Sequence, residues 1–457
     1  MKFILLSIFT FLQSLIWAQV KPDTDLTFLV KKIEMVYAGY NDKVNPKEFE
    51  QLINEIEQSE LKDTFALLSR LTFYFKDYHL ALFQKEISKT FDANVCNKNI
   101  EIVDRYKKQN SKKNYYKGYW ISEANDMVIY ITLSDRCIYS GYVVESKKPI
   151  PLGLRIFKLQ KKGKEWVADF INIARDYRVF VRSFFYHANT LIIGSYAKFK
   201  KINNYHQTLL KGKTEFNHKP SFTVVDTANV VITMPDFSGD LIDVYDSIIK
   251  VNEKIIRNSK NLIIDIRNNQ GGYTNCYDSL IPFICTHSIL RSPSYTLCSQ
   301  DLIDDAKNDK QESALKKDTA LVVFYDKYIN KLLASKDTFI YEPSDTMPCA
   351  SKNNMVKNVG IITNYGCRSA AELMILDLRQ SSKVKVFGEH TAGAVDYLNI
   401  LSFKLPITNF TLWVGTSKRK LTENQPAYDK TGIKPDIEIS GDVSDWVDFV
   451  KKYYEKN

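Results

Sequence analysis

The sequence predicts a multidomain α+β protein with a helical N-terminal region, a β-rich middle domain and an α/β core. Three patterns carry this prediction. Apolar residues recur at helical spacing from Asp23 to about Phe91, short aromatic and β-branched runs fill residues 115–215, and strands alternate with helices from Ser221 to about Ile439. A chain of 457 residues is also too long for one compact core, so two or three domains are expected.

Composition and charge narrow the class of protein. A content of 44% hydrophobic and 25% charged residues is ordinary for a folded chain. The formal net charge is +10, but basic and acidic residues are interspersed along the chain. A nucleic-acid-binding protein would need a basic stripe on a recognisable module, and the sequence has none. We therefore expect no nucleic-acid partner.

Residues 1–18 have the pattern of a secretory signal peptide. One basic residue, Lys2, precedes an apolar stretch that Gln13 and Ser14 interrupt, and cleavage is expected after the small residue Ala18. The stretch is too short and broken for a comfortable membrane span, and no other segment approaches spanning length. The mature protein is predicted to be exported, to the periplasm or the extracellular space, without an integral membrane segment.

Seven cysteines are an odd number for an exported chain, so at least one is free or pairs between chains. No pair has the CxxC spacing of a zinc or redox motif. A disulfide such as Cys96–Cys137 is possible, but sequence does not assign the pairing. No metal or cofactor is implied.

The N-terminal helical region is placed at residues 19–95. One helix carries Leu26 to Tyr37, a second begins near Asn45-Pro46 with proline at its first position, and a third runs from Leu61 to about Asp77-Tyr78-His79. The β-rich domain is placed at 96–220 and is read as a small antiparallel barrel or sandwich.

The α/β core is placed at residues 221–445, followed by a C-terminal tail at 446–457. The run Lys260–Arg267 reads as a buried strand that enters the glycine-containing turn Asn268–Gly272. Residues 299–357 are polar and irregular apart from a predicted strand at Leu321–Phe324 and a helix over Tyr328–Leu333. We interpret them as an insertion or lid over the core.

The segment Gly366–Glu372 is the most informative part of the core. It follows the apolar run Val359–Thr363 and places Ser369 where a strand ends and a helix begins. A serine there is either a helix cap, paired with Glu372 in a capping box, or a nucleophile at the positive end of the helix. Taken alone, the segment favours the cap.

Three other segments occur before and after this serine, and their order along the chain is informative. They are the strand and turn Ile264–Gly272, the loop Phe387–Gly393 and the tail Tyr428–Ile439, which contains Gly432-Ile433-Lys434-Pro435-Asp436. With Ser369-Ala370-Ala371-Glu372 they resemble the S41 family of serine peptidases, the group of C-terminal processing proteases and tricorn-like peptidases. The resemblance covers about residues 221–440 and reaches the N-terminal region through Asp77-Tyr78-His79.

The resemblance implies a ClpP/crotonase-like core that hydrolyses peptide bonds through an acyl-enzyme, with Ser369 as nucleophile. In the processing-protease branch a lysine follows the loop, but this chain has Ala394 there, so a Ser–Lys dyad is not expected. The tricorn-like branch instead implies His79 as general base and Asp429 as third member, although that branch usually has glutamate at the Asp429 position. His390, within the loop, is a rival base.

The same resemblance implies an oxyanion hole formed by the backbone N–H of Ala370 and those of Gly271 or Gly272. The expected partner is a peptide or protein substrate. A PDZ module is not expected, since residues 96–220 contain only a weak match to its binding loop, at Pro151–Leu154.

Two alternatives stay open on the sequence. One is a catalytically inactive protein that uses the S41 fold to bind a peptide or other ligand, and the other is an enzyme acting on different acyl compounds. The sequence does not indicate substrate sequence or oligomeric state.

Overall fold

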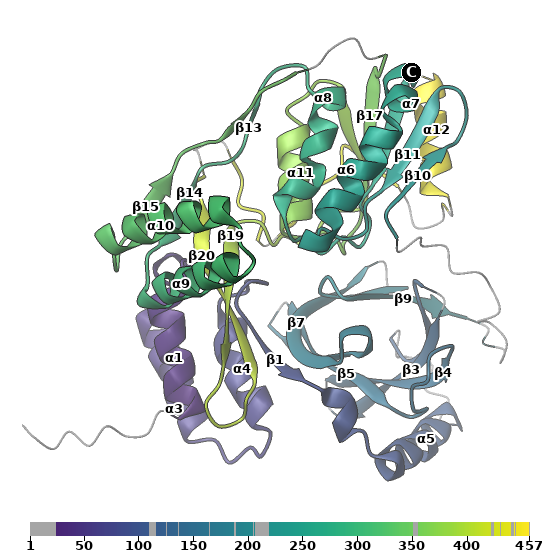
Figure 1. The fold of residues 1–457 in the computed structure, drawn as a ribbon. Coiled ribbons are helices and arrows are strands. Elements are labelled where there is room, and N and C mark those ends of the chain that lie inside the picture. The colour runs from purple at the N-terminus through teal and green to yellow at the C-terminus, as the bar shows by residue number, and fades with distance from the viewer. Residues whose placement is uncertain are drawn as a thin grey trace, which may run out of the picture.

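The computed structural model describes residues 24–456 except 109–115, 125, 136, 164, 187–188, 204, 206–218, 351–354, 422–424, 430, 440–442 and 444. The predicted signal peptide lies outside the described residues. The described chain combines a helix-rich N-terminal part, a β-barrel and an α/β core (Figure 1). The fold class predicted from the sequence is therefore confirmed. Among the described helices, none has the length and apolarity needed to cross a membrane.

The N-terminal part consists of α1 (Asp25–Val36), α2 (Tyr40–Lys43), α3 (Pro46–Glu57) and α4 (Thr64–Tyr74). The predicted start of α3 is confirmed: the Asn45 side chain accepts the backbone N–H of Glu48, and Pro46 occupies the first helical position. After α4 the chain turns through Asp77–His79 into β1 (Ala81–Lys85). His79 thus lies just before a strand.

The middle of the chain forms a closed antiparallel barrel, preceded by η1 (Ile87–Thr90) and α5 (Ala93–Lys108). Each strand pairs with the next, and the last, β9, pairs with the first, β2, which decides for a barrel over a sandwich. A barrel of this strand number is just wide enough for its inward side chains to fill, and Trp120, Leu159 and Phe199 are buried in its core. Its strands are β2 (Gly118–Ser122), β3 (Met127–Asp135), β4 (Ile138–Ser146), β5 (Arg155–Lys162), β6 (Glu165–Asn172), β7 (Tyr177–Tyr186), β8 (Thr190–Ile193) and β9 (Ala197–Ile202), with η2 (Ile173–Arg175) between β6 and β7.

Strand β1 joins the barrel to a second group of strands. On one edge it pairs with β7 of the barrel, and on the other with β20 (Thr411–Arg419), which forms a hairpin with β19 (Tyr397–Lys404). Strands β14 (Ser294–Leu297) and β15 (Phe339–Glu342) extend the sheet beyond β20. The segment that carries His79 is therefore held between the barrel and this hairpin.

The core is a six-stranded sheet in the order β10-β11-β12-β17-β18-β21, antiparallel only at β10. Because parallel strands end at the same edge, the turns after β12 and β17 lie side by side. The strands are β10 (Ser221–Val224), β11 (Asn229–Thr233), β12 (Asn261–Asp265), β17 (Asn358–Thr363), β18 (Val384–Gly388) and β21 (Ile437–Glu438).

Helices cover both faces of the core sheet (Figure 1). One face packs against η4 (Gly239–Leu241), α6 (Ile242–Val251), α7 (Glu253–Asn258), η5 (Thr274–Leu280), α8 (Ile281–Ile284) and α11 (Ala370–Leu378). The segment set apart as a C-terminal tail forms α12 (Trp446–Lys456), which packs its Trp446, Val450 and Tyr454 on the opposite face. Strands β13 (Ile289–Leu290) and β16 (Thr346–Met347) form a separate pair.

The insertion differs from its prediction. Residues predicted as a strand at Leu321–Phe324 lie in a helix, α10 (Thr319–Ala334), which follows α9 (Gln300–Leu315). Local β-propensity is overridden because Asp318 caps the helix and Ile329 and Leu332 are buried at helical spacing. Both helices contribute to the apolar core of the N-terminal helices, so the insertion packs there (Figure 1).

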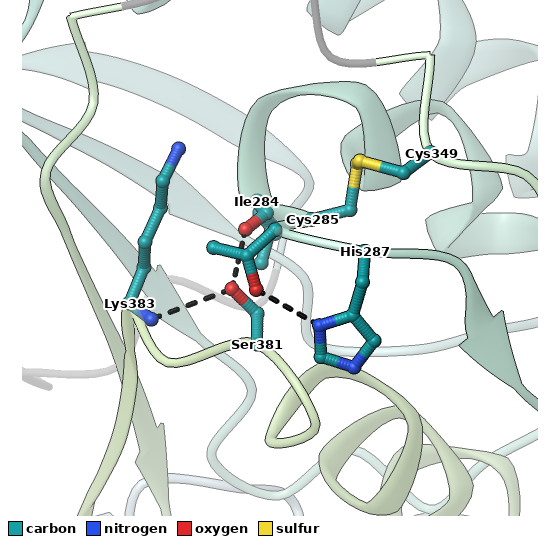
Figure 2. Close-up of a disulfide and its surroundings, with 7 residues drawn as sticks. Ile284, Cys285, His287, Cys349, Ser381 and Lys383 are labelled. Atoms are coloured by element: carbon teal, nitrogen blue, oxygen red, sulfur yellow. Dashed lines mark hydrogen bonds between the residues drawn. A yellow bond between two sulfur atoms is a disulfide. The ribbon is translucent and has the colours of Figure 1, made fainter.

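The structure also assigns the cysteine pairing that the sequence left open. Cys285 and Cys349 form a disulfide that closes a loop of 64 residues, beside the hydrogen bond from the Ser381 hydroxyl to the Ile284 carbonyl oxygen (Figure 2). The pairing Cys96–Cys137 is not formed, and both thiols are free, Cys96 in the barrel core and Cys137 exposed.

Candidate active site

Ser369 lies in the turn between β17 and α11, where it is partly exposed while both chain neighbours are buried. Its backbone has φ 58° and ψ −125°, a combination that non-glycine residues rarely adopt. Such a conformation costs on the order of 1–3 kcal/mol and persists only where the surroundings impose it. The turn thus holds the Ser369 side chain at the N-terminal end of a nine-residue helix.

Hydrogen bonds from the turn after β12 hold the Ser369 turn in this conformation. Asn268 donates its backbone N–H to Oδ1 of Asn364 (2.8 Å) and accepts the Asn364 side-chain amide at 2.9 Å. The backbone N–H of Arg368 donates to the Asn269 carbonyl oxygen at 3.0 Å. The two turns that the parallel strands bring to one edge are therefore bonded to each other.

Gly271 makes the closest approach to the serine. It has φ 85°, and a β-carbon built on it would lie 2.7 Å from Cβ of Ser369, 2.7 Å from the Arg368 carbonyl oxygen and 2.8 Å from the Ala370 nitrogen. Only glycine fits this position, since two of the three atoms belong to backbone.

Three backbone N–H groups lie in the two turns that meet at Ser369. The N–H of Gly271 is engaged with Oδ1 of Asn269 at 2.8 Å. For the N–H groups of Gly272 and Ala370, no acceptor is found within the part of the chain that the structure describes. Ala370 is the first residue of α11, so its N–H is available at the positive end of that helix.

Glu372 ties the serine turn to the loop after β18. Its carboxylate is fully buried and accepts the backbone N–H groups of Ser369 (3.1 Å), Gly393 (2.8 Å) and Ala394 (2.7 Å) as well as the Thr391 hydroxyl. Burial raises the pKa of Glu372 to about 7, although these hydrogen bonds act to lower it. The carboxylate therefore positions both segments.

His79 is buried, and its surroundings favour the neutral imidazole. Burial lowers its pKa below the ordinary 6.5; nearby Asp77 and the Tyr397 backbone oppose this, and Arg368 adds to it. Asp77 accepts the His79 backbone N–H at 2.8 Å and the Tyr37 hydroxyl at 2.6 Å. Nδ1 of His79 has no hydrogen-bond partner among the described residues.

The structure does not join His79 directly to Ser369 or to Asp429. Within the described residues, no hydrogen bond links the imidazole to either side chain. The field of Arg368, the residue before Ser369, reaches the imidazole and lowers its pKa. The base and the nucleophile predicted from sequence therefore lie in neighbouring parts of one region without direct contact.

Asp429 is buried and faces a different partner. Its carboxylate forms an ion pair with Lys43 at 2.7 Å, while its backbone N–H donates to Asp396 and its carbonyl oxygen accepts from Arg182. The rival base His390 donates from Nδ1 to the Thr391 carbonyl oxygen and packs against Phe184. No cluster of His, Cys, Asp and Glu side chains able to hold a metal ion occurs in the described ranges.

Comparison with known proteins finds one matching family. Residues 229–439 match the model of peptidase family S41. The chain carries an S41 peptidase core. It is accordingly a serine-type peptidase, as the sequence resemblance predicted, and the match does not single out the tricorn-like branch. A search of curated proteins finds no match.

Solved structures match the chain at low identity, and one of them has a TM-score above 0.5. Mature CPAF in complex with lactacystin is 14% identical, with a TM-score of 0.51, and the alignment covers 94% of this chain and 97% of that one. A protein described as a peptidase from Parabacteroides merdae ATCC 43184 is 13% identical, with a TM-score of 0.43 and coverage of 94% and 91%. The photosystem II D1 C-terminal processing protease is 12% identical, with a TM-score of 0.39 and coverage of 92% and 93%.

Within the S41 core, the loop and tail motifs of the sequence meet as one unit. The Thr391 backbone N–H donates to the Ile433 carbonyl oxygen at 3.0 Å, and the Ile433 N–H donates to the Thr391 hydroxyl at 2.7 Å. A β-carbon on Gly432 would lie 2.0 Å from the Thr391 carbonyl oxygen. The tail therefore supports the loop that Glu372 ties to Ser369.

Contacts between the barrel and the S41 core escaped the sequence analysis. The buried Arg368 guanidinium binds the Tyr196 hydroxyl at 3.1 Å, and the buried ammonium of Lys198 pairs with Glu389 (2.5 Å) and Glu123 (3.1 Å). Arg368 adjoins the serine and Glu389 lies in the loop after β18. The available signal was that Arg368 and Glu389 both lie inside recognised motif segments, Gly366–Glu372 and Phe387–Gly393.

Proposed function

We propose that this S41 peptidase is exported and cleaves peptide bonds through an acyl-enzyme formed on Ser369. The observation that carries the proposal is the strained, partly exposed Ser369 at the start of α11, next to the Ala370 N–H, which has no acceptor within the described residues. A mere helix cap has no need of this strain, whereas a nucleophile that must project from a tight turn does.

The chemistry assigns one role to each group. Oγ of Ser369 attacks the scissile carbonyl carbon and passes its proton to His79, and the N–H groups of Gly272 and Ala370 stabilise the oxyanion. His79 then protonates the departing amine, which leaves an ester on Ser369. Water, activated by His79, hydrolyses that ester and restores the serine. Gly271 could add a third donor only after its N–H leaves Asn269.

His79 suits the role of base because its imidazole is held neutral and its Nδ1 lacks a partner among the described residues. Contact with Ser369 would have to form when substrate binds, since catalytic hydrogen bonds are often long in the free enzyme. Asp429 remains the proposed third member, and it would have to exchange Lys43 for His79. Asp77, already bonded to the His79 backbone, is the competing carboxylate.

Two observations support export. Residues 1–18 read as a signal peptide, and the Cys285–Cys349 disulfide is of a kind that persists in oxidising compartments. The proposed substrate is a peptide or an unfolded protein segment. The inactive binding protein considered on the sequence is not favoured by the S41 match.

Covalent labelling tests the nucleophile. A fluorophosphonate probe should label the unaltered chain, and Ser369→Ala should abolish labelling and lower peptide cleavage by about 10³-fold or more. The exposed Ser382→Ala serves as the matched control and should behave like the unaltered chain. Labelling of the Ser369→Ala chain at full rate would refute the assignment.

Peptide cleavage also distinguishes the two candidate orienting carboxylates, Asp429 and Asp77. Asp429→Asn should lower kcat/KM by at least tenfold, and because it leaves the Lys43 ammonium without its carboxylate it should also lower the free energy of unfolding. Full activity of Asp429→Asn, together with loss of activity in Asp77→Asn, would transfer the orienting role to Asp77.

A further inference from the structure

A cavity of about 220 Å³ lies between the barrel and the loop after β18. The barrel contributes Trp166, Arg182 and Phe184, the loop contributes His390 and Ala392, and Tyr78 closes one side from the segment before β1. Pockets for whole drug-sized ligands span about 300–1,000 Å³, so this cavity has the size of a site for a single side chain.

Hydrogen bonds connect the wall of this cavity to the serine turn. Ala392 donates its backbone N–H to the carbonyl oxygen of Cys367, two residues before Ser369, at 2.9 Å. Thr391, also in the wall, donates its hydroxyl to Glu372, and the Glu372 carboxylate accepts the Ser369 N–H. A single hydrogen bond thus links the cavity wall to the turn that carries Ser369.

The base is equally close along the chain, since Tyr78 lies between Asp77 and His79. Tyr78 is half-buried and feels the charges of Arg182, Arg368 and Glu372, which act on its pKa after the dominant effect of burial. The cavity therefore adjoins both segments that carry the proposed catalytic groups.

The cavity wall combines apolar rings with one guanidinium that has no carboxylate partner among the described residues. Arg182 donates to the Asp429 carbonyl oxygen at 2.6 Å, whereas Glu165 pairs with Lys76 at 2.8 Å. The imidazole of His390 donates to Thr391 and packs its face near Phe184, with ring centroids 5.9 Å apart. Phe184, Trp166 and Tyr78 supply apolar surface, and the positive charge of Arg182 opposes a second cation.

We propose that this cavity is a subsite that accepts an apolar side chain of the peptide substrate, with Phe184 as the specificity-determining residue. The inference rests on the proposed function of Ser369. An apolar side chain gains from leaving water in such a pocket, whereas a basic one would lose hydration beside the Arg182 guanidinium.

Cleavage of a peptide library tests the subsite. At one position relative to the scissile bond, the unaltered chain should prefer apolar over basic residues by about tenfold or more. Phe184→Glu places a carboxylate beside Arg182 and should abolish or reverse this preference. Leu152→Glu is the matched control, since Leu152 is a barrel residue that lies outside this cavity and is 47% exposed, and it should leave the profile unchanged.

A second variant keeps the subsite testable if the charged Phe184 variant does not fold. Phe184→Leu keeps the wall apolar and enlarges the cavity, so it should retain the apolar preference and shift it toward larger side chains. An unchanged library profile in both Phe184 variants would overturn the subsite.

Fluorophosphonate labelling distinguishes this failure from that of the function. If Ser369 is labelled in every variant while the library profiles are identical, the catalytic assignment stands and the subsite is wrong. If the unaltered chain is not labelled at all, the proposed function fails and the subsite fails with it.

Discussion

Replacing Gly271 by alanine should disable the active site while the chain still folds. The new methyl group would lie 2.7 Å from Cβ of Ser369 and from the Arg368 carbonyl oxygen. Carbon atoms in ordinary contact are about 3.5–4.0 Å apart, so one side must yield by about 1 Å. The Arg368 oxygen is backbone and cannot rotate away, and the displacement therefore falls on the turn that carries Ser369.

The expected effects on rate and on stability differ in size. A misplacement of about 1 Å in a catalytic group costs about 10² in rate. The positive φ of 85° adds strain of roughly 1–2 kcal/mol for a residue with a β-carbon. We expect kcat/KM and the rate of fluorophosphonate labelling to fall by about 10²-fold, and thermal unfolding to shift down by only a few degrees.

Gly163 offers a matched control for this prediction. It also has a positive φ, 60°, but a β-carbon there would meet nothing within 4 Å. Gly163→Ala should therefore reproduce the backbone strain and leave peptide cleavage unchanged. Equal activity in the two variants would refute the argument that contact with Gly271 holds Ser369 in place.

The remaining predictions concern pH and the barrel interface. Because burial holds the pKa of His79 below 6.5, the acid limb of kcat/KM that reports protonation of the imidazole should have its midpoint below pH 6.5; an acid limb of the His79 chain centred above pH 6.5 would contradict this. The same lowered pKa makes His79 favour the folded state above pH 6.5 and oppose it as pH falls, so His79→Gln should flatten the acid side of a stability profile. Lys198→Met leaves the partly buried carboxylates of Glu389 and Glu123 without their partner and should lower the free energy of unfolding by about 3–5 kcal/mol. Lys89→Met removes an exposed ion pair and should change that free energy by about 1 kcal/mol or less. Denaturant titrations measure both values.

Local patterns predicted the elements well where periodicity and capping agreed. The start of α3 at Asn45-Pro46, the buried strand β12 and the serine at the head of α11 all follow from short-range chemistry. The segment Leu321–Phe324 was misassigned, because its β-branched and aromatic residues favour a strand by propensity. Packing of Ile329 and Leu332 against the N-terminal helices makes it part of α10.

Pairings between distant segments could not be read from the chain. The closure of the barrel by β9 with β2 and the choice of Cys349 as the partner of Cys285 depend on which surfaces meet after folding. The same holds for Asp429, whose neighbour in space is Lys43. Motif spacing along the chain predicts which residues belong to one site, but it does not specify which side chains contact each other there.

The sequence by itself determined the S41 core, the serine at the start of a helix and the glycine turn that precedes it, because each is a local pattern of residue types. Tertiary structure alone decided how those pieces act on one another. It placed Gly271 against Ser369, gave the Glu372 carboxylate to both the serine turn and the loop after β18, and set the barrel against that loop to form the cavity beside Phe184. These contacts join residues that lie as much as two hundred positions apart, and only a packed core brings them together.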